Sequence, residues 1–229
     1  MGAVVLHLAV LAIALLNPQE KNEAEELFRK MEEKLVAAKT IHLKTEGVVE
    51  PVKLKLSGEL WLDEGNRARM ELEGKTEEVN RSAVIISDGR TVRKAQDENA
   101  RSIVASERYG THVRTCFARF GFLGMTDQWD DTVADPLETR RLSGFRLGAK
   151  EKVGEREAQA VEYRIGGEPA EVTLWIDLKS HLPLKRTVTQ APQRFGKMGE
   201  VTVIREMYAD VKLDERVDPA KFELSKEKK

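Results

Sequence analysis

Polar and apolar residues alternate along most of the chain after residue 40. Ile41, Leu43 and Thr45 are separated by polar residues, and the same period of two returns in later segments. Such alternation is typical of antiparallel strands that bury one face and expose the other. Short turns connect them, among them Asp88-Gly89, a pair typical of a type I′ hairpin. About ten strands are expected, in the runs 41–46, 53–62, 67–72, 84–86, 91–92, 144–150, 160–165, 171–177, 184–190, 200–209 and 222–224.

Two segments have the period of a helix instead. Asn22, with Glu25 three residues later, predicts a helix start, and apolar residues follow at helical spacing as far as Leu35. Residues 105–125 carry aromatic side chains at spacings of three and four, which predicts one or two short helices. The expected order is a helix, a meander of strands, a helical insert and a second meander.

The pattern predicts a fold that is mainly β with α. A broad antiparallel sheet with one apolar face must cover that face. We therefore expect an open, incomplete antiparallel barrel, in which the N-terminal helix and the helical insert cover the concave face of a strongly curved sheet. Two short helices need not fill that space, so an apolar ligand cavity is expected there. The expected ligand-binding residues are Leu54, Leu56, Leu60, Leu62, Met70, Leu72, Leu174 and Ile176 on strands, with Val113, Phe117 and Phe120 on the insert.

The first residues predict an export signal. The apolar run 4–16 would span about 20 Å as a helix, short of the roughly 30 Å hydrocarbon core of a bilayer. Ala12-Ile13-Ala14 supplies a small-residue cleavage pattern. We expect a signal peptide over residues 1–20, cleaved near residues 14–22, and a single periplasmic or secreted domain over residues 21–229.

Composition and charge narrow the class of function. The chain has 38 basic and 39 acidic residues, and this balance argues against a nucleic-acid-binding protein. Cys116 is the only cysteine and is interpreted as a small buried hydrophobe, so no internal disulfide is expected. The sequence contains no hydrolase elbow, zinc-protease motif or phosphate-binding loop. We expect a monomer with no enzymatic activity, no cofactor and no metal.

Four arginines lie in and around the helical insert, namely Arg101, Arg108, Arg114 and Arg119. They could form a docking face for an anionic lipid or an acidic partner. They could equally be the solvated outer face of an amphipathic helix. The sequence leaves both interpretations open.

Several short motifs, taken in order, resemble the LolA-like family of periplasmic lipoprotein carriers. Residues 57–62 read SGELWL, residues 85–92 read IISDGRTV and residues 217–222 read VDPAKF. They are similar to the family's G-[DE]-L-W strand, S-D-G-K-T hairpin and closing V-D-x-x-x-F segment. Residues 175–184 resemble a later hairpin of the wider superfamily. The resemblance implies an incomplete barrel around a hydrophobic cavity that shields acyl chains of lipids or lipoproteins, with an inner- or outer-membrane protein as a further partner.

One departure from the family pattern concerns the lid over that cavity, to which Phe117 and Phe120 are expected to contribute. Carriers of the family place an arginine before a P-N turn, where it holds the lid, whereas this chain has Glu64 there. Arg67 and Arg69 follow closely and could replace that arginine if they turn inward. The resemblance implies a lipid or lipoprotein carrier for outer-membrane lipoprotein sorting. The alternative is an envelope-stress sensor of the same fold that binds a membrane-anchored protein.

Overall fold

The computed structural model describes residues 22–96, 99–125, 140–167, 170–191 and 201–223. The predicted signal peptide lies outside these ranges. Within them, helices α1 (Glu23–Ala37) and α2 (Tyr109–Gly124) and the short 3-10 helix η1 (Pro219–Phe222) accompany one antiparallel sheet of eleven strands. The strands are β1 (Ile41–Glu50), β2 (Leu54–Leu62), β3 (Arg67–Lys75), β4 (Asn80–Asp88), β5 (Thr91–Gln96), β6 (Asn99–Val104), β7 (Leu142–Val153), β8 (Arg156–Ile165), β9 (Ala170–Asp177), β10 (Pro183–Gln190) and β11 (Thr202–Leu213).

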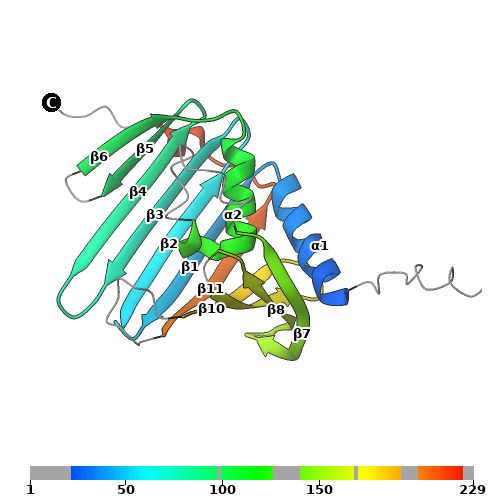
Figure 1. The fold of residues 1–229 in the computed structure, drawn as a ribbon. Helices are drawn as coiled ribbons and strands as arrows, with labels where there is room; N and C mark the ends of the chain where they lie inside the picture. Colours follow the sequence, from blue (N-terminus) through cyan, green and yellow to red (C-terminus); the bar gives the residue numbers. More distant parts are fainter. Residues whose placement is uncertain (1–21, 97–98, 126–139, 168–169, 192–200, 224–229) are drawn as a thin grey trace, which may run out of the picture.

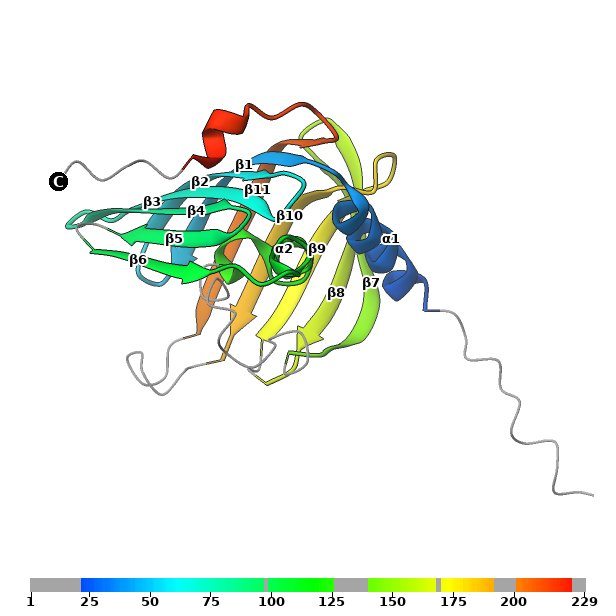
Figure 2. The same cartoon turned by 90° about the horizontal axis from the view of Figure 1, so that it is seen from above.

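The sheet is open and strongly curved. Its strand order is β6-β5-β4-β3-β2-β1-β11-β10-β9-β8-β7, so β1 and β11 join the two meanders in the middle. β6 and β7 form the two edges. The strands bend around α2, which lies inside the curve, while α1 crosses the concave side near β7 and β8 (Figures 1 and 2). The predicted fold class is therefore confirmed.

Helix α1 forms as the sequence predicts. The Asn22 side chain accepts hydrogen bonds from two backbone N–H groups of the first turn, at 3.1 and 3.2 Å. The apolar stripe faces the sheet, where the centroid of the Phe28 ring lies 5.2 Å from that of Phe145 and 5.1 Å from that of Tyr163. The helix thus packs by the face that its hydrophobic spacing marks.

Helix α2 is buried on most of its surface. Val113, Cys116 and Phe117 are each at most 3 % exposed, which confirms that the cysteine is a small buried residue. Gly121 has φ of +81°, and this non-helical residue divides the helix in two. The prediction of one or two short helices is met by one helix with a sharp kink.

Three local predictions need correction. Strand β6 was not expected, because its short run, NARSIV, is interrupted by charge; pairing with β5 forms it. Residues 222–224 were expected as a strand, but Phe222 ends η1, because Asp218 caps a turn that Pro219 begins. The hairpin at Asp88 is present, but it is not type I′, since Gly89 and not Arg90 has a positive φ.

Candidate functional site

The cross-strand register determines which side chains share the concave face with the helices. Leu43, Leu60, Met70 and Ile85 lie opposite one another on four consecutive strands, and all four are buried. Directly opposed residues of antiparallel strands point to the same face. Every second residue counted from these positions therefore lies on the concave face.

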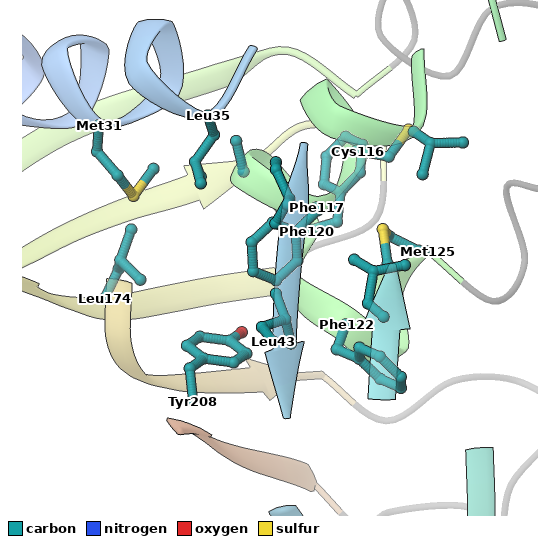
Figure 3. Close-up of a cluster of buried hydrophobic side chains, with 14 of the residues drawn as sticks. Met31, Leu35, Leu43, Cys116, Phe117, Phe120, Phe122, Met125, Leu174 and Tyr208 are labelled. Atoms are coloured by element: carbon teal, nitrogen blue, oxygen red, sulfur yellow. The ribbon is translucent and has the colours of Figure 1, made fainter. Parts of the chain in front are cut away.

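Most of the predicted ligand-binding residues lie in a packed core. Eight of them are at most 4 % exposed and belong to one hydrophobic cluster between the helices and the sheet. Figure 3 shows Phe117, Phe120 and Leu174 of this group meeting Leu35 and Tyr208 in the space that the sheet encloses. The helices fill this part of the concavity, and a role for these residues in ligand binding stays a prediction. The eight are Leu60, Leu62, Met70, Val113, Phe117, Phe120, Leu174 and Ile176.

The other three predicted residues line a hollow on the same face. Leu54, Leu56 and Leu72 are only partly buried and form the floor of a hollow of about 320 Å³. Val79, which is 43 % exposed, and Ala83 complete its apolar wall. The hollow lies at the ends of β2, β3 and β4, next to the packed core.

The ring of Phe122 forms the boundary between the core and the hollow. A Cβ atom at Gly58 would overlap this ring, so the ring lies directly on the backbone of β2. Gly58 is opposite Leu72 and two residues from Leu56. The last turn of α2 therefore ends where the hollow begins.

Buried charges hold α2 at its kink. The carboxylate of Glu206 accepts hydrogen bonds from the N–H groups of Phe122 and Leu123, at 3.1 and 2.7 Å. These N–H groups follow the kink and have the positive character of a helix start. Arg186, 1 % exposed, donates to the carbonyl of Ala118 at 2.6 Å, on the other side of the kink. We call Arg186 and Glu206 the buried clamp.

Two tyrosines complete this network. The Tyr208 hydroxyl bonds to the Glu206 carboxylate, and the Tyr163 hydroxyl donates to the carbonyl of Arg119 at 2.8 Å. Burial raises the pKa of both phenols, and that of Tyr208 well above its ordinary value. Both therefore stay protonated and act as hydrogen-bond donors at neutral pH.

The first turn of α2 is anchored by different residues. The Asn66 side chain accepts a hydrogen bond from the Gly110 N–H at 2.9 Å. Arg114, 6 % exposed, donates to the carbonyls of Lys39 at 2.9 Å and Asp63 at 3.3 Å. The buried guanidinium of Arg114 thus links α2 to these two backbone carbonyls by charge-assisted hydrogen bonds.

These contacts bear on the four arginines around the insert. Arg114 is buried, and Arg119 bonds to Glu32 of α1 at 2.5 Å, so both serve internal packing. Arg114 and Arg119 therefore belong neither to a docking face nor to a solvated helix face. Arg101 is exposed on β6.

Arg67 and Arg69 lie on the convex face of β3, whereas Met70, which follows Arg69 in the sequence, points to the concave face and the helices. Arg67 pairs with Asp63 at 2.6 Å, and Arg69 pairs with Glu71 at 2.6 Å. Neither arginine turns inward, because alternation along β3 directs both away from α2, so the condition under which they could replace the family's arginine is not met. Glu64 is exposed, with 64 % of its side chain accessible, whereas its neighbour Asp63 is buried against Arg67.

A larger hollow, of about 650 Å³, lies on the convex face. Its lining mixes both signs of charge, including Glu46, Glu73, Lys55, Lys75 and Arg205. Such a surface suits solvent and ion pairs better than an apolar chain. The concave hollow is therefore the candidate site.

No helix among the described residues is long and apolar enough to cross a membrane. No protein-family model and no curated protein matches the chain. Solved structures do show similarity. LprF from Mycobacterium bovis is 9 % identical, with 86 % of this chain and 95 % of that chain covered and a TM-score of 0.49. The LolA superfamily protein NE2245 from Nitrosomonas europaea is 12 % identical, with 88 % and 97 % covered and a TM-score of 0.36.

A third structure is the MucA/MucB complex of Pseudomonas aeruginosa, 14 % identical, with 88 % of this chain and 61 % of that chain covered and a TM-score of 0.45. At these identities the likeness concerns the fold alone, and it carries no ligand or partner to this chain.

The buried clamp was missed in the sequence. Arg186 and Glu206 both occupy positions that alternation assigns to the buried face, next to Val188 and Tyr208. A charged residue at an inward position of a strand was the available signal. Arg186 and Glu206 also lie directly opposite each other in the register of the neighbouring strands β10 and β11.

Proposed function

We propose that the protein is an exported, non-enzymatic carrier that holds an acyl chain of a lipid or lipoprotein on its concave face. The supporting observation is the hollow of about 320 Å³ floored by Leu54, Leu56 and Leu72. Small-molecule sites range from about 300 to 1,000 Å³, so this hollow suits one chain. Each methylene removed from water contributes about 0.8 kcal/mol.

The arrangement also suits release. The hollow lies beside the packed core and not inside it, so a chain can leave without unfolding the cluster around Phe117. The floor stays in place because Leu54, Leu56 and Leu72 belong to paired strands of the sheet, while the buried clamp holds the last turn of α2 beside it. Export rests on the N-terminal apolar run, and the sensor alternative stays a prediction.

Binding of the uncharged fluorescent probe N-phenyl-1-naphthylamine tests the proposal. In Leu56→Asp a carboxylate replaces part of the apolar floor, and we expect affinity to fall by on the order of tenfold. The matched control is Ser57→Asp, which places the same charge one residue away on the exposed convex face. Leu60→Asp is not a suitable variant, because Leu60 is fully buried and its substitution would unfold the domain.

Circular dichroism must show that both variants keep the fold of the unaltered protein. Equal probe affinity in Leu56→Asp and Ser57→Asp would contradict a site in the hollow. Absence of any probe binding to the unaltered protein would contradict the carrier function itself.

A further inference from the structure

The concave face carries three cations beside the hollow. Arg81 lines the hollow directly. Lys94 lies opposite Ile85, and Arg101 lies opposite Lys94, so both share the face of the buried Ile85. Lys94 is also a diagonal neighbour of Ala83, which lines the hollow, at roughly 7–8 Å between backbones. Arg81 therefore lies in the hollow, and Lys94 and Arg101 continue the same face from it across β5 and β6.

Among the described residues of β1–β6 and α2, no acid shares the face of these cations. Across the described positions of β1–β6, the register places no Asp or Glu side chain on the concave face. Helix α2, which packs over this face, has the sequence YGTHVRTCFARFGFLG and contains no acid. Within the described part of the chain, Arg81, Lys94 and Arg101 form no ion pair.

The convex face of the same strands has the opposite arrangement. There, acids and bases occur together and form ion pairs, such as His42 with Glu59 at 2.6 Å and Arg69 with Glu71 at 2.6 Å. The excess of positive charge is thus confined to the face that carries the apolar hollow. A general surplus of surface charge does not account for it, since the chain as a whole has a net charge of -1.

Placing Lys94 directly opposite Arg101 has an energetic cost. Like charges at opposed positions of an antiparallel pair destabilise the sheet, because their Cβ atoms lie roughly 4.5–5.5 Å apart. A bound anion between the two cations removes this repulsion. The apolar floor then suits the hydrocarbon chain of an amphiphilic molecule, and the cations suit its anionic head group.

We infer that the ligand is a single-chain amphiphile with an anionic head group, carboxylate or phosphate. Its chain lies on Leu54, Leu56 and Leu72, and its head group lies between Arg81, Lys94 and Arg101. This inference rests on the proposed function, because it assigns the head group of the ligand whose chain the hollow holds.

Competition against N-phenyl-1-naphthylamine compares dodecanoate with dodecanol, which has the same chain and no charge. We expect dodecanoate to bind on the order of three- to tenfold more tightly at low ionic strength, as suits partly exposed charges, and salt to reduce this preference. The triple variant Arg81→Gln, Lys94→Gln, Arg101→Gln should bind both ligands equally. The matched control is Lys44→Gln, Lys55→Gln, Lys75→Gln, which removes the same charge from the convex face and should keep the preference.

The outcomes separate this inference from the proposed function. Equal affinity of the unaltered protein for dodecanoate and dodecanol overturns the anionic head group and leaves the chain site intact. A preference that survives in the concave-face variant, or that disappears in the convex-face control, also overturns it. Failure of both ligands to displace a bound probe overturns the inference, and failure of the probe itself to bind overturns the proposed function as well.

Discussion

The buried clamp makes a strong prediction about stability. Arg186→Met keeps the approximate length of the side chain and removes its charge and hydrogen bonds. The substitution leaves the Glu206 carboxylate, which is 3 % exposed, without its opposing charge. It also leaves the carbonyl of Ala118, now bonded at 2.6 Å, without its donor.

The expected loss is about 3–5 kcal/mol of unfolding free energy, the range for a buried charge left without its opposing charge. Lys185 on the same strand provides the control. Its ammonium pairs with Glu151 at 3.3 Å and lies 4.0 Å from the Trp175 ring, but it is partly exposed. Lys185→Met should therefore cost about 1 kcal/mol or less.

Urea unfolding followed by circular dichroism measures both free energies. A second variant separates charge from packing, since Arg186→Met with Glu206→Gln removes the orphaned charge but keeps an acceptor for the Phe122 and Leu123 N–H groups. This double variant should be more stable than Arg186→Met alone. A loss below about 1 kcal/mol in Arg186→Met, or no recovery in the double variant, would refute the view that the opposite buried charges of the clamp hold α2.

Two further predictions concern the same network. Gly121→Ala should lower the free energy of unfolding by about 1–3 kcal/mol, because residue 121 has a positive φ and a Cβ there would overlap the Glu206 carboxylate. Gly65→Ala is the control, because Gly65 has a similar φ of +68° and a Cβ there would meet nothing within 4 Å. An equal loss of stability in both variants would rule out the overlap as the cause. Burial raises the pKa of Tyr208, so the stability given by its neutral form is fully present below the ordinary tyrosine pKa of about 10 and is lost as pH rises further. Tyr208→Phe should lose less stability than the unaltered protein between neutral and strongly alkaline pH, and equal losses in urea unfolding would contradict this.

Much of the fold follows from periodicity alone. Alternation in the first meander and the helical stripe of α1 determine which faces are apolar, and one apolar face of a broad sheet requires a cover. Strand β6 escaped prediction because it is an edge strand, and its residues gain stability by pairing with β5 more than by burial. The η1 turn was hidden because the apolar Phe222 suits a short strand and a turn equally well.

The candidate site followed less completely from the sequence. Alternation correctly placed Leu54, Leu60 and Leu174 on one face, but it cannot tell which stretch of that face the helices cover. That depends on where α2 ends, which in turn depends on Gly121, Phe122 and the contact of the Phe122 ring with β2. These are long-range contacts, and hydrophobic spacing carries no information about them.

The anchoring of α2 also determines which part of the candidate site can change its conformation. The helix is anchored by Arg114 near its start and by the buried clamp at its kink, both through buried charges that are costly to displace. The hollow, in contrast, is floored by β2–β4, and beyond β4 the sheet continues only through β5 to the edge strand β6. Because an edge strand is held on one side only, this outer part of the sheet moves at lower cost than the strands beside β1. Adjustment to proposed ligands with head groups of different size should therefore occur between Arg81 and Arg101.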